Sequence, residues 1–96
     1  MTNEISNHGF SVSPEAAASF HDDGIVILHT GKGRLFSSNR TGAQIWRGLE
    51  QQLTVEVIAQ QLSGDYQIAL NAAREHTAGF LSQLQRQQLV QREARQ

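Results

Sequence analysis

Alternating and continuous runs of apolar residues in the first forty positions predict short β-strands. Residues 10–13 alternate phenylalanine and valine with serine, which is typical of a short strand. The β-branched, apolar run 25–30 follows the turn sequence Asp-Asp-Gly and predicts a second strand. Two glycines within 31–33 then predict a tight hairpin that returns through a third strand at 34–38. Residues 15–20, EAAASF, fit either a helical turn or an extended connection.

Beyond residue 40, apolar positions recur every three to four residues and predict three helices. Thr41 and Gln44 have the spacing of a capping box at the start of the first helix. Thr54 is the expected N-cap of the second helix. Gly64 predicts the end of that helix and Asp65 the start of the third, across the short turn of a helix-turn-helix. The apolar stripes consist of Ile45, Trp46, Leu49 and Leu53, then Val55, Ile58, Ala59 and Leu62, then Leu70, Ala73, Thr77, Phe80, Leu81 and Leu84.

Three strands followed by three helices predict an α+β domain of the winged helix-turn-helix class. A chain of 96 residues can bury one modest core, so we expect one domain. If the strands of the three-stranded antiparallel sheet follow sequence order, the strand at 34–38 lies at its edge. We expect the domain to span residues 10–90, with a flexible N-terminus at 1–9 and a flexible polar tail at 91–96.

Composition and charge exclude several classes of protein. The chain contains no cysteine, so a disulfide framework and a thiolate metal site are excluded. No apolar run approaches the roughly 18 residues of a membrane span, and the N-terminal sequence lacks the pattern of a secretory signal. The net charge of −1 provides no concentration of positive charge for nonspecific binding to nucleic acid. We therefore expect a cytoplasmic protein without a membrane or nucleic-acid partner.

The titratable residues form no pattern typical of an active site. His21 with Asp22 and Asp23 is the nearest approach to a metal site, but adjacent residues in an extended turn rarely converge on one ion. No nucleophile and base can be paired from their spacing. We expect His29 to lie at the sheet surface and His76 to border a groove. The sequence thus predicts no catalytic residue, no metal site and no cofactor.

The predicted third strand offers an open edge. It contains no proline and no inward-pointing charge, the usual protections of an edge strand, so it suits strand addition by an extended peptide or a homodimer through the sheet. The strand at 25–30 is apolar on both faces, and its outer face could be covered by the N-terminal segment or by a partner. As the alternative, the helix-turn-helix could read DNA, with Arg74 on the recognition helix and Lys32 and Arg34 on the wing.

Three stretches together resemble the PqqD-like family, which is named after the small protein of pyrroloquinoline quinone biosynthesis. The family includes recognition elements of pathways that modify ribosomally made peptides. The stretches are GIVILHTGKGRLFSSNRTGAQIW, LTVEVIAQQLSGDY and AGFLSQLQRQQLV, and the resemblance covers residues 10–90. Ser38 and Gln88 stand where the family usually has leucine and glycine. The nearest matches are Asn39-x-Thr41-Gly42-Ala43-x-Ile45-Trp46 and Phe80-Leu81-x-x-Leu84, ending at Leu89-Val90.

The resemblance implies a non-catalytic winged helix-turn-helix that binds the leader segment of a precursor peptide. The leader would add as a strand beside residues 34–38, in a groove against the third helix. The domain would then deliver it to a modifying enzyme such as a radical-SAM enzyme, a cyclase or a leader protease. We expect Phe36 to face the core and Leu35 to contact the bound peptide. The predicted peptide-binding residues are Arg34, Leu35, Phe36, Ser37, Ser38, Ala73, Arg74, Thr77 and Leu81.

Overall fold

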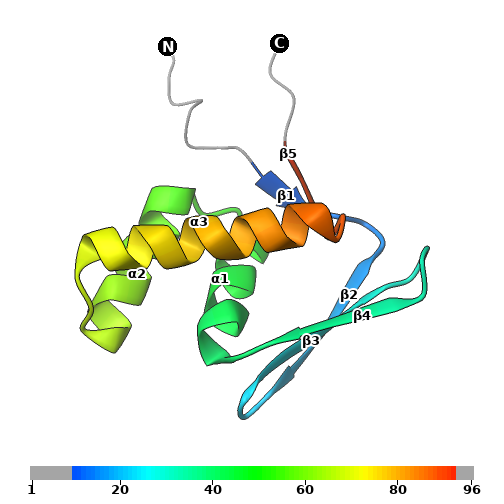
Figure 1. The fold of residues 1–96 in the computed structure, drawn as a ribbon, viewed down its shortest axis with the longest axis horizontal. Helices are drawn as coiled ribbons and strands as arrows, with labels where there is room; N and C mark the ends of the chain where they lie inside the picture. Colours follow the sequence, from blue (N-terminus) through cyan, green and yellow to red (C-terminus); the bar gives the residue numbers. More distant parts are fainter. Residues whose placement is uncertain (1–9, 93–96) are drawn as a thin grey trace.

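The computed structural model describes residues 10–92, which form two small sheets and three helices (Figure 1). No helix in this part of the chain is long and apolar enough to cross a membrane. The elements in chain order are β1 (Phe10–Val12), β2 (Ala16–His21), β3 (Gly24–His29), β4 (Arg34–Ser38), α1 (Arg40–Glu50), α2 (Val55–Tyr66), α3 (Leu70–Arg86) and β5 (Val90–Arg92).

The three-stranded sheet is antiparallel and follows the order β2-β3-β4. β4 is an edge strand, as predicted for residues 34–38. The first strand of the sheet is β2, from the ambiguous segment 15–20, and the prediction that residues 10–13 occupy this place is wrong. β2 alternates half-buried and exposed residues, because every second side chain faces the helices, and Phe20 pairs with Ile25. The α+β architecture of three strands followed by three helices is confirmed.

β1 pairs with β5, which follows α3, in a separate antiparallel sheet. Val12 lies opposite Val90, and Val90 is buried. Just beyond the pair, the N–H of Ser13 donates a hydrogen bond of 2.8 Å to the carbonyl of Leu89. The apolar side chains of β1, Phe10 and Val12, pack against the core, and the start of the described chain is tied to its end (Figure 1).

The β5 strand changes the expected boundary of the domain. Two residues of the predicted tail 91–96 belong to β5, because their backbone groups have a partner in β1. The rest of that tail, and the predicted flexible N-terminus 1–9, lie outside the described residues.

The first two helices begin at side-chain caps. Asn39 caps α1, since its Oδ1 accepts a hydrogen bond of 3.0 Å from the N–H of Gly42; the prediction of Thr41 was two residues late. Thr54 caps α2 as predicted, and its Oγ1 accepts a 3.1 Å hydrogen bond from the N–H of Val57. Both caps satisfy backbone donors that a helix start leaves free.

The end of α2 differs from the sequence prediction. The helix continues through Gly64 and Asp65, which we expected to separate α2 from α3. Gln67 ends it instead, with a left-handed φ of 54°, and donates its N–H to the carbonyl of Ser63. Ser63 Oγ in turn donates a 2.6 Å hydrogen bond to the carbonyl of Ile68. These two bonds close the turn, so no glycine is needed there.

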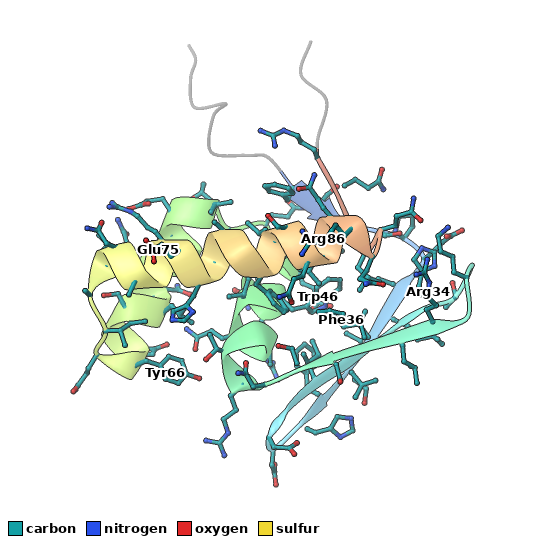
Figure 2. The ribbon with its side chains drawn as sticks, viewed as in Figure 1. Arg34, Phe36, Trp46, Tyr66, Glu75 and Arg86 are labelled. Atoms are coloured by element: carbon teal, nitrogen blue, oxygen red, sulfur yellow. The ribbon has the colours of Figure 1, made fainter. Side chains whose placement is uncertain are left out.

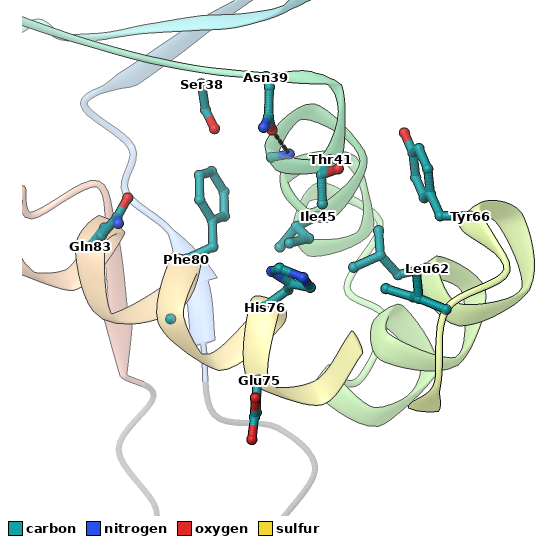
Figure 3. A pocket seen from close by; sticks show the side chains of 13 residues that line it. Ser38, Asn39, Thr41, Ile45, Leu62, Tyr66, Glu75, His76, Phe80 and Gln83 are labelled. Carbon is teal, nitrogen blue, oxygen red and sulfur yellow. Dashed lines mark hydrogen bonds between the residues drawn. The ribbon is translucent and has the colours of Figure 1, made fainter. Parts of the chain in front are cut away.

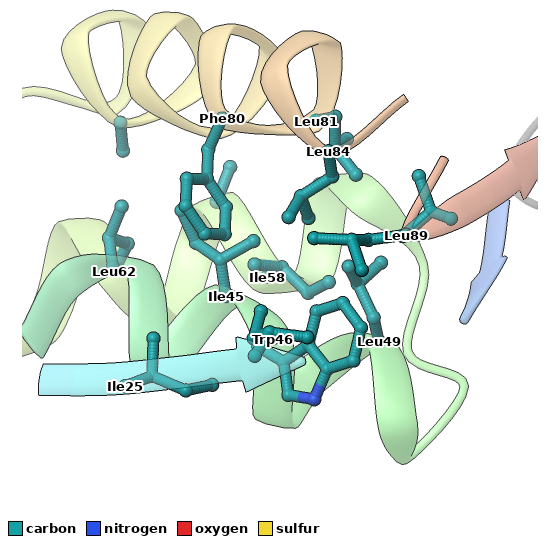
Figure 4. Close-up of a cluster of buried hydrophobic side chains, with 14 residues drawn as sticks. Ile25, Ile45, Trp46, Leu49, Ile58, Leu62, Phe80, Leu81, Leu84 and Leu89 are labelled. Carbon is teal, nitrogen blue, oxygen red and sulfur yellow. The ribbon is translucent and has the colours of Figure 1, made fainter. Parts of the chain in front are cut away.

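The core lies between the inner face of the sheet and the three helices (Figure 4). The predicted stripes are confirmed, since the central residues of each are buried. Trp46 is fully buried, and its Nε1 donates a 2.9 Å hydrogen bond to Glu50 Oε2. The buried apolar residues are Ile25, Ile27, Ile45, Trp46, Leu49, Ile58, Ala59, Leu62, Ala73, Phe80, Leu81, Leu84, Leu89 and Val90.

Candidate functional site

The outer edge of β4 presents unpaired backbone groups at alternate residues. The N–H of Thr30 donates to the carbonyl of Glu15, in line with β2, so the even-numbered residues of β3 bond to β2. In an antiparallel ladder the odd-numbered residues of β3 then bond to β4, and their partners there are even-numbered. The N–H and C=O of Leu35 and Ser37 therefore point away from the sheet. No strand within residues 10–92 pairs with them.

The side chains of β4 divide between the two faces of the sheet. Phe36 is half-buried and points toward α3 (Figure 2), where its ring centroid lies 5.9 Å from that of Phe80. Leu35, opposite Leu28, lies on the other face, and the two side chains are 71% and 37% exposed. β1 does not cover this outer face, because it pairs with β5. The structure agrees that Phe36 faces the core, but it places Leu35 away from α3.

Three of the four α3 residues predicted to bind peptide lie in the core. Ala73 and Thr77 are 0% exposed and Leu81 is 3% exposed. Thr77 satisfies its own hydroxyl by donating a 2.8 Å hydrogen bond to the carbonyl of Ala73. These residues face the sheet and the other helices, so the expectation that they line a groove is corrected. The side of α3 available to a ligand is the adjacent one.

Arg74, the fourth predicted residue, is exposed and binds Glu56 of α2. Its Nη2 and Nε lie 2.7 and 3.0 Å from the two carboxylate oxygens, a bidentate arrangement. The hydrogen bond from Arg74 lowers the pKa of Glu56, and the same bond raises the pKa of Arg74. The pair joins α2 to α3 and lies outside the pocket described next.

A pocket of about 480 Å³ lies where the end of β4 and the start of α1 meet α2 and α3 (Figure 3). Among its apolar lining residues, Tyr66 is exposed and Ile68 is half-buried, whereas Ile45, Leu62 and Phe80 are buried in its floor. His76 and Gln83 line the pocket from α3. Glu75 points away from the other labelled side chains. The complete lining is Ser38, Asn39, Thr41, Gly42, Ile45, Leu62, Tyr66, Ile68, Glu75, His76, Gly79, Phe80 and Gln83.

The wall between β4 and α1 depends on the sequence Ser38-Asn39-Arg40-Thr41-Gly42. Asn39 ends the strand and caps the helix, which turns the chain sharply at the pocket. A Cβ on Gly42 would collide with the side chain of Ser38 and lie 2.9 Å from a ring carbon of Phe80. Glycine here lets β4, α1 and α3 meet closely. The motif that carried the family resemblance is therefore the motif that builds this wall.

The three histidines of the described residues lie in different surroundings. His76 is exposed and borders the pocket, as predicted. His29 is buried, not at the sheet surface as expected, and its Nδ1 accepts a 3.2 Å hydrogen bond from the N–H of Lys32. His21 Nε2 lies 3.0 Å from Ser19 Oγ. Among residues 10–92 no three His, Asp or Glu side chains gather closely enough to hold a metal ion.

Of the predicted peptide-binding residues, Ser38 lines this pocket, while the four predicted on α3 do not. Gly79, Gln83, Tyr66 and Ile68 line the pocket but were not predicted. One signal was present in the sequence: Gly79 lies in the interior of a predicted helix, where glycine is unfavourable. An apolar floor with a polar rim beside an open strand edge can hold an extended peptide and its side chains.

Two solved structures and one family model are similar to this chain. The solved structure of TbiB1 in complex with the TbiA(beta) leader peptide superimposes with a TM-score of 0.81 and 25% identity, covering 88% of this chain and 99% of that one. A lasso peptide synthetase B1 complexed with the leader peptide has a TM-score of 0.77 and 25% identity, covering 84% and 95%. No curated protein sequence gives a significant match. The family model of coenzyme PQQ synthesis protein D (PqqD) matches residues 24–90, and the chain therefore belongs to the PqqD family.

Proposed function

We propose that this protein is a non-catalytic adaptor that binds the leader segment of a ribosomally made precursor peptide. The leader adds as a strand to the outer edge of β4 and places side chains in the pocket beside α3. The observation that carries this proposal is the unpaired backbone of Leu35 and Ser37 on the strand whose last residue, Ser38, lines that pocket. The two structural neighbours support it, because both are complexes with leader peptides.

The energetics of strand addition require apolar anchors as well as backbone pairing. Leu35 and Ser37 together offer two N–H and two C=O groups, and each hydrogen bond contributes about 0.5–1.5 kcal/mol net. Ordering a disordered segment costs roughly 2–5 kcal/mol, which is of similar size. Affinity and specificity must therefore come from side chains that the leader buries in the pocket, where Tyr66 and Ile68 offer accessible apolar surface.

The proposed binding residues are revised by the fold. Residues 34–38 keep their role as the receiving strand. On α3, the proposed residues are now His76, Gly79, Phe80 and Gln83, which line the pocket. Ala73, Thr77 and Leu81 do not line it.

DNA binding, the alternative function, gains no support from the charges of α3. Arg74 is engaged by Glu56, and Glu75 adds a negative charge next to it on the exposed side of the helix. Phosphate contacts need accessible positive groups. We expect the protein to show no affinity for duplex DNA at moderate salt.

A leader-binding domain without catalytic residues requires an enzyme partner. We propose that it presents the bound precursor to a modifying enzyme, such as a radical-SAM enzyme, a cyclase or a leader protease. Because precursor peptides of this kind are made by ribosomes, we place this encounter in the cytoplasm.

The test is a titration with a fluorescently labelled leader peptide, taken from a short precursor reading frame encoded beside this gene. Saturable binding is expected for the leader and not for a scrambled peptide of the same composition. A labelled DNA duplex serves as the second arm at the same salt concentration. Tight binding of DNA, together with indifference to the order of the leader sequence, would overturn the proposal.

A further inference from the structure

Gly79 is a helical glycine that the fold itself does not require. Glycine in a helix interior is unfavourable compared with alanine, so its presence needs a reason. Gly42 and Gly48 have one, because a Cβ at these positions would collide with the side chains of Ser38 and Ile58. A Cβ on Gly79 would meet no atom within 4 Å. Packing within the described chain therefore leaves this glycine unexplained.

The position of Gly79 connects it to the pocket. It lies near the middle of the 17-residue α3, is exposed, and belongs to the pocket lining. His76 and Gln83 are three residues before it and four after it, so all three share one face of the helix. Both flanking side chains project toward the pocket (Figure 3). Gly79 thus leaves a gap in this row of side chains.

We propose that Gly79 is a specificity-determining residue, whose missing side chain admits a large apolar side chain of the bound peptide. The inference rests on the proposed function, in which a peptide strand pairs with β4. Side chains of such a strand alternate, so every second one points toward α3. The side chain nearest Ser38 then enters between β4 and α3 and occupies the open space over Gly79, against the apolar lining of the pocket.

The variants Gly79→Ala and Gly79→Leu test this role, with Gly64→Ala and Gly64→Leu as matched controls. Gly64 is also helical, exposed and surrounded by open space, but it does not line the pocket. Gly79→Ala should raise the melting temperature by about 4–8 °C, because alanine favours the helix. A clear fall in the melting temperature would show that the fold needs this glycine, and would overturn the proposal.

The binding probe is a displayed library of random 20-residue peptides, enriched on the parent protein. The most enriched peptide is then synthesised and titrated against each variant. We expect Gly64→Leu to bind like the parent and Gly79→Leu to bind at least tenfold more weakly. Enrichment on Gly79→Leu should select peptides with a smaller residue at the anchor position. Equal affinity of the parent and Gly79→Leu would overturn the assignment.

The same experiment separates this inference from the function on which it rests. If the parent enriches no peptide, leader binding itself is wrong and the role of Gly79 falls with it. If peptides are enriched and every variant binds them equally, leader binding stands and only the role of Gly79 is rejected. A Gly64→Leu protein that loses as much affinity as Gly79→Leu would also reject it, because the effect would not be local to the pocket.

Discussion

The two edges of the three-stranded sheet differ in what lies beside them. The alternation that frees Leu35 and Ser37 on β4 also frees Ala18 and Phe20 on β2, among the residues described, whereas the N–H of Ala16 donates a 3.0 Å hydrogen bond to the carbonyl of Ser13. The pocket, however, is lined by the end of β4 and by no residue of β2. Unpaired backbone alone is thus available twice, and the anchoring surface distinguishes the proposed binding edge.

The β2 edge also carries a partial cover of its own. The guanidinium carbon of Arg47, from α1, lies 4.0 Å from the centre of the Phe20 ring. Such a cation–π contact places charge beside the strand, and charge near an edge discourages pairing with another chain. We therefore expect a peptide to bind at the edge that has a helix-lined pocket beside it, which is the edge of β4.

The largest expected effect is a loss of stability that would disrupt both edges of the sheet together. Trp46→Ala should destabilise the fold by about 3–5 kcal/mol, because it deletes a fully buried aromatic side chain. Urea denaturation monitored by circular dichroism measures this loss. This variant shows how peptide binding is lost when the whole fold is destabilised. The edge variants described next should lose binding while they stay folded. A change below 1 kcal/mol would show that Trp46 is not central to the core.

Proline substitutions compare the two edges directly. Ser37→Pro removes an outward N–H of β4, and Ala18→Pro removes one from β2, so neither breaks a bond to β3. Ser37→Pro should weaken leader binding at least tenfold, or about 1.4 kcal/mol, through the lost hydrogen bond and the bulk of the ring. Ala18→Pro should bind like the parent. Titration of both folded variants with the labelled leader decides between the edges, and the reverse ranking would assign the site to β2.

The sequence indicated β4, the helix order and the central core residues because each follows from a local pattern. It did not resolve β2, since Ala-rich EAAASF suits helix and strand alike and only pairing with β3 decides. The pairing of β1 with β5 joins residues about eighty positions apart, which no local pattern can indicate.

The residues predicted on α3 differ from those that line the pocket for another reason. Ala73, Thr77 and Leu81 belong to the apolar stripe and are at most 3% exposed, so their side chains pack within the core, and none of them lines the pocket. The rotation of α3 against the sheet separates these two sets, and that rotation follows from packing. His76 was placed correctly because it lies beside the stripe.

A smaller effect is expected at the outer face of β4. Leu35→Asp should leave the melting temperature nearly unchanged, since the side chain is largely exposed. It should weaken leader binding less than Ser37→Pro does, because Leu35 points away from the pocket. Titration beside the Ser37→Pro variant measures this difference. A loss of tenfold or more would mean that the leader places its anchors on the outer face, near Leu28.

The smallest effect concerns the ion pair that joins α2 to α3, remote from both edges. The pKa of Glu56 is lowered by Arg74, so the pair stabilises the fold above the usual glutamate pKa and loses this effect as pH falls through the lowered value. Glu56→Gln should therefore melt slightly below the parent at neutral pH and approach it in acid. Thermal melts across this pH range test it, and leader binding at neutral pH should not change.

Backbone hydrogen exchange, with and without the labelled leader, tests the central claim most directly. If the leader adds to β4, the amides of Leu35 and Ser37 should exchange freely in the isolated protein and become protected when the leader binds. The amides of Ala18 and Phe20 should exchange equally in both states. Protection that appears on β2, or binding that leaves both edges unprotected, would contradict strand addition to β4.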